Sequence, residues 1–279
     1  MASPRRPVRV AFLELGVIGA SQLLENLLDE RADRPDLEVR AWGSGTKMQE
    51  PQAAIADEVV TWSPDLAVLS CPNAGLPGPA RAWKALALAG PTLVVSDGPA
   101  RKAAPEMEKA GAGYILLTGD VMLGARREFL DPTEMALFNA DILKVLAVCG
   151  ALRLLHEEVD RVVAALAGGK RPALPRMVAD GPTVVARAGF SNPYAAAKAL
   201  AAHGTAEAAG ALAHEACFKM ERPEDYLPAC AAVHEMARAA ARLADEAREA
   251  EKGADRVLRT PHGKDGNMLR KSKLMEKPG

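Results

Sequence analysis

Charged side chains gather ahead of one predicted helix in the middle of the chain. Five of them follow one another in a short segment: Arg126, Arg127, Glu128, Asp131 and Glu134. Asp131 fits a helix N-cap followed by proline, and Glu134 stands where it can complete a capping box. The amino end of this helix therefore stays polar while its apolar faces are buried. The competing interpretation is a well-capped structural helix with solvated arginines.

Two further polar residues lie inside predicted helices. Asn139 interrupts an apolar, helically spaced run over 131–155, so we expect a buried amide that needs either a core hydrogen bond or a ligand. His234 precedes Glu235 in a later helix, without the second histidine of an HExxH metal motif. We expect His234 either to contact a substrate or to hydrogen-bond between packed helices.

The elements that must position these residues fall into an α/β pattern followed by a helical one. Apolar runs separated by amphipathic helices, the first over 21–29, predict buried strands at 8–15, 37–42, 66–70, 92–96 and 114–117. Such alternation is typical of a parallel sheet covered by helices on both faces. Alanine-rich helical runs then follow at 131–168, 192–218 and 223–252.

This order predicts three regions. We expect a Rossmann-like α/β domain over 1–123 that binds a coenzyme, and a helical bundle over 124–252 that carries the substrate-binding helix start. A hairpin-like β segment over 253–279 completes the chain. The closely spaced alanines let helices approach one another and also suit a subunit interface.

Ligands bind at the carboxyl ends of strands in open parallel sheets. The residues predicted there are small, polar or proline, and we expect them to bind a cofactor: Gly16, Gly19, Ser44, Pro72, Asn73, Asp97 and Gly98. The pair Gly16 and Gly19 forms only half of a dinucleotide fingerprint, which argues against an ordinary NAD-binding mode. A tight strand-to-helix turn is the alternative interpretation.

Composition excludes several classes of protein. The 279 residues contain 35 basic and 36 acidic side chains, and this balance gives no general attraction to nucleic acid or to an anionic membrane. No run is long enough to span a bilayer, so we expect a cytoplasmic protein. The four cysteines are far apart without a CxxC pair, and the five histidines are scattered. We therefore expect buried thiols and no metal.

The segment over 124–153 resembles the corresponding block of the F420-dependent methylenetetrahydromethanopterin dehydrogenases. Other strings resemble this family in the same order along the chain: LLDERADR at 27–34, GSGTKM at 43–48, FSNPYA at 190–195, LADEAREAEK at 243–252 and VLRTPH at 257–262. The resemblance therefore covers nearly the whole chain.

The resemblance implies a reversible hydride transfer from methylenetetrahydromethanopterin to coenzyme F420, a reaction of one-carbon metabolism and methanogenesis. The methenyl product is stabilised by its own nitrogens, so no acid, base or nucleophile is required. The protein must hold donor and acceptor carbons about 3–3.5 Å apart and place negative charge beside the developing cation. Glu128, Asp131 and Glu134 are the candidates for that charge.

Further site roles follow from the same resemblance. Arg126, Arg127, Asn139 and His234 are candidate substrate contacts, and the strand-end residues are candidates for holding F420. A homo-oligomer, hexameric in the family, is expected.

The chain departs from the family pattern at the first strand end. Glu14-Leu15-Gly16-Val17 stands where members usually carry a Lys-Cys-Gly-Asn type of sequence. Cys71 and the loop after 96 also differ. These changes lie on the proposed cofactor side, so a changed or weakened preference for the hydride carrier is one hypothesis. Two alternatives therefore remain: an enzyme that uses the same pterin with NAD(P), and a non-catalytic pterin-binding homologue.

Overall fold

A six-stranded, all-parallel sheet lies at the centre of the molecule. The computed structural model describes residues 6–31, 34–121, 129, 131–263 and 267–279. Its strands are β1 (Val8–Glu14), β2 (Leu37–Gly43), β3 (Leu66–Cys71), β4 (Thr92–Asp97), β5 (Gly113–Leu117) and β6 (Arg176–Ala179), in the order β2-β1-β3-β4-β5-β6. The chain reverses direction across the sheet between β1 and β3, and a ligand-binding crevice forms at such a switch point.

The five strands expected from the apolar runs are confirmed, each within one residue at either end. The sixth was not predicted. It has four residues at the sheet edge, three of them partly or fully exposed, so the apolar signal of a central strand is missing.

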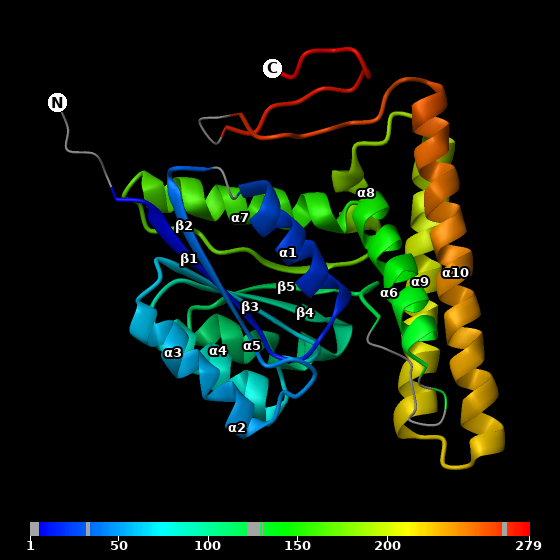
Figure 1. Cartoon of the computed structure of the whole chain (residues 1–279), viewed down its shortest axis with the longest axis horizontal. Helices are drawn as coiled ribbons and strands as arrows, with labels where there is room; N and C mark the ends of the chain where they lie inside the picture. Colours follow the sequence, from blue (N-terminus) through cyan, green and yellow to red (C-terminus); the bar gives the residue numbers. More distant parts are fainter. Residues whose placement is uncertain (1–5, 32–33, 122–128, 130, 264–266) are drawn as a thin grey trace.

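Helices cover both faces of the sheet and continue beside it (Figure 1). They are α1 (Gly19–Arg31), α2 (Glu50–Ala53), α3 (Ile55–Trp62), α4 (Pro77–Ala89), the 3-10 turn η1 (Gly98–Ala103), α5 (Ala104–Lys109), α6 (Pro132–Cys149), α7 (Ala151–Ala167), α8 (Gly181–Ala188), α9 (Pro193–Phe218) and α10 (Pro223–Gly253). Figure 1 shows α1 and α7 on one face, α3, α4 and α5 on the other, and α6, α9 and α10 standing together at one side.

Alternating side chains of β1 divide the core into two layers. Val10 and Phe12 pack with α1, α6 and α7, whereas Ala11 and Leu13 pack with α3 and α4. This period of two is what a strand buried on both faces requires. The buried faces of α9 and α10 are mostly alanine, so these two helices pack closely against each other and against α6.

The helical run predicted over 131–168 is two helices, not one. Gly150 ends α6 with φ +111°, and a Cβ at this position would lie 2.1 Å from the Val184 carbonyl oxygen. Only glycine tolerates this conformation and contact. No single helix among the described residues is long and apolar enough to cross a membrane; α6 and α7, bent by 62°, reach that length and composition only as a pair.

The chain ends in a short hairpin-like segment above α7. Two antiparallel bridges, Arg259 with Lys271 and His262 with Met268, match the predicted β segment. The proposed division into 1–123, 124–252 and 253–279 stays a prediction, and β6 and α7, both from the second region, complete the α/β layers.

Candidate functional site

The loops after β1 and β3 meet at the switch point of the sheet. Gly16 has φ +77°, and a Cβ there would lie 3.0 Å from the Pro72 ring. The Gly16 N–H donates to Ser44 Oγ at 3.3 Å, and that hydroxyl donates to the Lys47 carbonyl oxygen at 2.6 Å. Three of the predicted strand-end residues, Gly16, Ser44 and Pro72, are thereby brought into one loop cluster.

Asp120 occupies the amino end of α1. Its two carboxylate oxygens accept hydrogen bonds from the Gly19 N–H at 2.8 Å and from the Ala20 N–H at 2.7 Å. A dinucleotide-binding fold places a ligand phosphate at this position. A Cβ on Gly19 would lie 2.8 Å from the Asp120 oxygen, so the tight-turn interpretation accounts for this glycine. Burial raises the pKa of Asp120 to about 6, although the two N–H donors oppose the shift.

Asp97 ends β4 and carries the least satisfied carboxylate at this edge. The residue is 5% exposed, and its Oδ1 has no hydrogen-bond partner among the described residues. Burial, with the charge of Asp120 as the second cause, raises the Asp97 pKa well above its usual range. Next to it, a Cβ on Gly98 would meet nothing within 4 Å, so this loop borders open space. A buried polar atom without a partner beside open space is a candidate ligand contact.

Asn73 has a local structural role. Its side-chain oxygen accepts a hydrogen bond from the Gly75 N–H at 2.9 Å in the loop that leads to α4. The side-chain amide N–H groups carry the remaining donor capacity of Asn73.

A small hollow of about 20 Å³ lies between the start of α1, the segment after β5 and α6. Its lining is Val17, Ile18, Gly19, Gln22, Val121, Asn139 and Ile142. Asn139 is exposed, so the expected burial of this amide is wrong. Its neighbour Phe138 takes the buried position on α6 and leaves Asn139 facing outward.

At the start of α6, Asp131 and Glu134 do different things. Asp131 accepts from the backbone N–H groups of Thr133 at 2.8 Å and of Glu134 at 3.1 Å, which is the N-cap that the sequence predicts. The Glu134 side chain is 46% exposed, and its Oε2 lies 3.6 Å from His234 Nδ1. Arg126, Arg127 and Glu128 lie outside the described residues.

His234 reaches this helix start from α10. Its ring is 4.6 Å from the Phe138 ring and 4.9 Å from the Phe129 ring, measured between centroids. Burial lowers the His234 pKa, and the Glu134 charge opposes that shift. The Nε2 atom has no hydrogen-bond partner among the described residues. The structure thus joins Glu134 and His234, which the sequence placed in separate helices.

Two residues at the carboxyl edge, Asp120 and His203, were not predicted from the sequence. Asp120 directly follows Gly119 after the fifth strand, and this position could have been found by the rule used for Asp97. His203 comes from α9, is 1% exposed and has neither ring nitrogen hydrogen-bonded among the described residues. A Cβ on Gly119 would lie 2.7 Å from its Nε2, so ring and loop are in contact. An isolated histidine in an alanine-rich helix gives no local signal.

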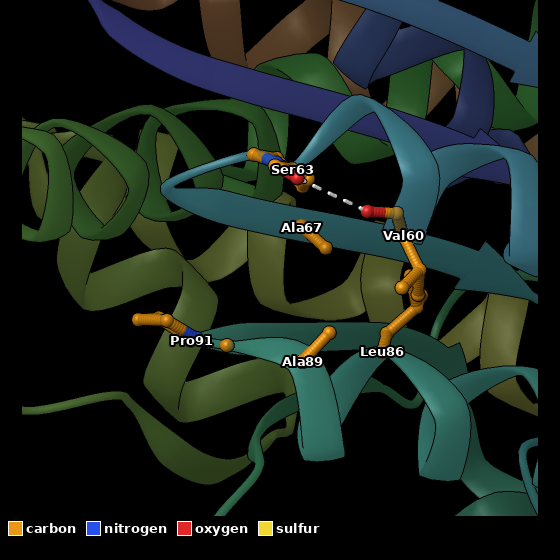
Figure 2. Close-up of a pocket in the computed structure, with 8 residues that line it drawn as sticks. Val60, Ser63, Ala67, Leu86, Ala89 and Pro91 are labelled. Atoms are coloured by element: carbon orange, nitrogen blue, oxygen red, sulfur yellow. Dashed lines mark hydrogen bonds between the residues drawn. The ribbon is translucent and has the colours of Figure 1, made fainter.

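Cysteines and the opposite edge of the sheet contribute nothing to this site. Cys71, Cys149 and Cys230 are buried as expected, whereas Cys217 is only half-buried. Burial raises the pKa of both Cys71 and Cys149 to about 12, which disfavours their reactive thiolate forms. Figure 2 shows a separate hollow at the amino ends of β3 and β4, lined by Val60, Ser63, Pro64, Ala67, Leu86, Ala89, Gly90 and Pro91. It lies at the edge of the sheet where such folds do not bind ligands.

Comparison with known proteins gives full-length matches. A sequence model of the methylene-5,6,7,8-tetrahydromethanopterin dehydrogenase family matches residues 8–279. F420-dependent methylenetetrahydromethanopterin dehydrogenases of Archaeoglobus fulgidus and Methanobrevibacter smithii are 51% and 48% identical, over 97% of this chain and 99% of theirs.

A solved structure shares the fold. It is an F420-dependent methylene-tetrahydromethanopterin dehydrogenase in complex with methylene-tetrahydromethanopterin and coenzyme F420. The TM-score is 0.94 at 44% identity, and the match covers 98% of this chain and 100% of that one.

Proposed function

Since the chain belongs to the methylene-5,6,7,8-tetrahydromethanopterin dehydrogenase family, we propose that it transfers a hydride reversibly from methylenetetrahydromethanopterin to coenzyme F420. The observation that carries this function is the end-to-end match to a dehydrogenase solved with both of these molecules. The chain is an oxidoreductase, and F420 is a co-substrate that binds and leaves.

The carboxyl edge of the sheet fits a flat ring system with polar ring atoms. The unpartnered Asp97 oxygen and the open space beside Gly98 support placing the coenzyme there, next to the loops of Gly16, Ser44 and Pro72. We include Gly19 and Asn73 in this proposed site. When bound, F420 supplies the carbon that accepts the hydride.

The start of α6 fits the pterin side. Glu134 carries a half-exposed carboxylate that can place negative charge beside a developing cation, and Asp131 is fixed by its cap. We propose that Glu128 adds to this charge and that Arg126, Arg127, Asn139 and His234 contact the substrate. None of these residues needs to transfer a proton, because a methylene carbon that loses a hydride yields a cation stabilised by the adjacent nitrogens.

Two observations weigh against the alternatives. Asp120 already accepts from the α1 N–H groups that an NAD(P) phosphate would use, which disfavours a nicotinamide carrier. At the first strand end, Leu15 is fully buried in the core, as is Cys71 at the third. These two departures from the family pattern are therefore changes of packing, and they favour a retained carrier site over a non-catalytic homologue.

We also propose that the protein forms a homo-oligomer, a hexamer by family resemblance. Large apolar side chains are exposed on α6 and α9: Leu137, Tyr194, Leu200 and Phe218. Such groups on the helical layer suit contact with a second copy. A cytoplasmic location stays a proposal that cell fractionation tests.

A turnover assay tests the function. Purified protein is mixed with methylenetetrahydromethanopterin and either oxidised F420, NAD or NADP, and absorbance of the carrier is followed. We expect reduction of F420 alone. Reduction of a nicotinamide only would reassign the carrier, and pterin binding without any reduction would establish the non-catalytic alternative.

A further inference from the structure

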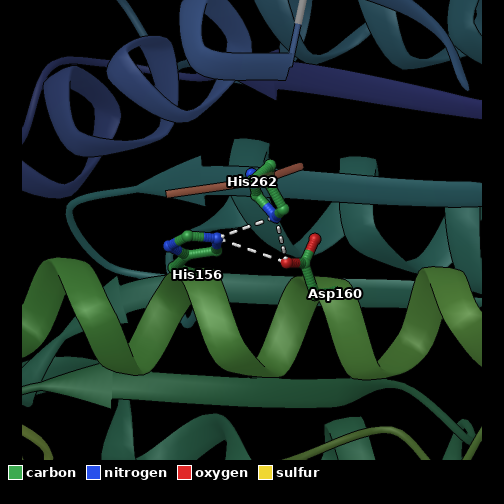
Figure 3. Close-up of side chains that lie close together, drawn as sticks. All are labelled: His156, Asp160 and His262. Carbon is green, nitrogen blue, oxygen red and sulfur yellow. Dashed lines mark hydrogen bonds and ion pairs between the residues drawn. The ribbon is translucent and has the colours of Figure 1, made fainter. Parts of the chain in front are cut away.

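Three side chains that commonly bind metals converge where the C-terminal segment crosses α7 (Figure 3). His156 and Asp160 lie one turn apart on α7, and His262 comes from the bridged segment after α10. His156 Nε2 is 3.1 Å from His262 Nε2 and 3.2 Å from Asp160 Oδ2, while His262 Nε2 is 2.6 Å from the same oxygen. None of these three residues is assigned to the dehydrogenase site.

Hydrogen bonds and a single cation are alternative ways to join the three side chains. Asp160 Oδ2 can accept from both imidazoles, with His262 Nε2 at 2.6 Å and His156 Nε2 at 3.2 Å. In that arrangement each Nε2 carries a proton, and the two nitrogens lie 3.1 Å apart. A cation at the centre would accept electron density from all three atoms at once.

The surroundings prepare Asp160 for such a role. Its Oδ1 accepts a hydrogen bond from Arg34 at 3.3 Å, which orients the carboxylate so that Oδ2 faces both imidazoles. Asp36 pairs with the same guanidinium at 2.7 Å and balances its charge. The side chains of His156, Asp160 and His262 are only 9%, 16% and 4% exposed. Partners that fix a ligating group in this way are typical of metal sites.

We propose that His156, Asp160 and His262 bind one divalent cation of the Zn²⁺ class, which fastens the C-terminal segment to α7. Tetrahedral metal–ligand bonds of 2.0–2.1 Å place the ligand atoms about 3.3 Å from one another. The two distances from His156 Nε2 are already close to this value, and the distance between His262 Nε2 and Asp160 Oδ2 must lengthen by less than 1 Å. Two imidazoles and one carboxylate suit Zn²⁺ or Co²⁺, and water completes the coordination. No metal was predicted, because the cysteines form no CxxC pair and the histidines are scattered along the sequence. Only the fold brings His262 beside the pair on α7.

Metal titration tests this proposal. Chelator-treated protein is titrated calorimetrically with Zn²⁺, and spectroscopically with Co²⁺, whose visible bands report tetrahedral geometry. We expect one equivalent to bind, with Co²⁺ bands that lack thiolate charge transfer, and protection of the segment after 253 from proteolysis. His262→Ala and Asp160→Asn should each abolish binding.

His214→Ala is the matched control, because His214 is exposed on α9 and contacts only Phe218 among the aromatic rings of the described residues. This variant should bind metal like the wild type. Circular dichroism confirms that each variant is folded. A wild-type protein that binds no Zn²⁺, or a folded His262→Ala protein that still binds a full equivalent, would overturn the proposal. Hydrogen bonds alone would then join the C-terminal segment to α7. Dehydrogenase activity is not a readout here, so failure of this proposal is independent of the proposed function.

Discussion

At the scale of the residue, the fold keeps two acids buried at the carboxyl edge of the sheet. Asp97 and Asp120 are 5% and 4% exposed, and each has a raised pKa caused chiefly by burial. Burying a carboxylate without full pairing costs stability, and such costs concentrate at functional sites. The two acids differ in their partners: Asp120 caps α1, whereas one oxygen of Asp97 has no hydrogen-bond partner within the part of the chain that the structure describes.

Asp97→Asn should trade activity against stability. Because the Asp97 pKa is higher in the folded protein than in the unfolded one, the wild type loses stability as pH rises above the unfolded-state pKa. The neutral amide avoids this loss, so the free energy of unfolding of Asp97→Asn at pH 7 should exceed that of the wild type by about 1 kcal/mol. If Asp97 contacts the coenzyme, kcat/KM for F420 reduction should fall about 10- to 100-fold. Urea unfolding and steady-state kinetics measure both. The control Asp57→Asn changes a side chain that is 64% exposed and should alter neither. Unchanged kcat/KM in Asp97→Asn would remove this residue from the site.

The Asp120 pKa predicts a pH-dependent stability. Its folded value of about 6 exceeds the ordinary 3.8, so the wild type should lose stability between pH about 4 and 6 and remain level above. Asp120→Asn carries no titrating group at this position. The free energy of unfolding of the variant, measured relative to the wild type, should therefore rise by about 1–3 kcal/mol between pH 4 and pH 7. Urea unfolding at both pH values measures it. Parallel profiles for the two proteins would contradict the burial argument.

Single residues were predictable only where a rule about position existed. Asp97, Gly98 and Pro72 lie at strand ends, and parallel strands bring these ends together in any fold of this class. Asn139 was predicted to be buried but is exposed. Helical periodicity does not show which part of a helix is covered by other elements of the fold. His203 carries no local pattern, since tertiary packing alone brings α9 against Gly119.

At the scale of the element, the corner between α6 and α7 sets where the start of α6 lies. Gly150 leaves no room for a side chain next to the Val184 carbonyl. Apolar periodicity continues through this glycine, so a corner there has almost no sequence signal, and the single long helix was the natural expectation. The five central strands, by contrast, were readable because each is buried on both faces and forms an unbroken apolar run.

Gly150→Ala should therefore destabilise the protein by about 3 kcal/mol or more, because it adds both a steric overlap and a strained φ. The α6 start should shift as well and lower turnover. Gly204→Ala on α9 is the matched control, because a Cβ there meets nothing within 4 Å. In a helix interior this exchange should stabilise by about 0.5–1 kcal/mol. Equal effects of the two exchanges in urea unfolding would refute the role assigned to the corner.

At the scale of the whole molecule, the proposed homo-oligomer would bury exposed apolar side chains of the helical layer. Tyr194 and Phe218 on α9 are 80% and 67% exposed. Light scattering should give a mass that is a multiple of 29.4 kDa. Replacing both residues with serine should lower that mass, whereas Leu88→Ser on α4, also exposed, should not. A monomeric wild type would contradict the proposed assembly.

Isotope transfer distinguishes direct hydride transfer between the two substrates from transfer through water. Methylenetetrahydromethanopterin with both hydrogens of its methylene carbon replaced by deuterium is converted with oxidised F420, and the reduced coenzyme is examined by mass spectrometry and NMR. We expect one deuterium per reduced F420, without exchange with water. Reduced F420 that carries no deuterium would show that the hydride does not come directly from the methylene carbon, and direct transfer would then be wrong.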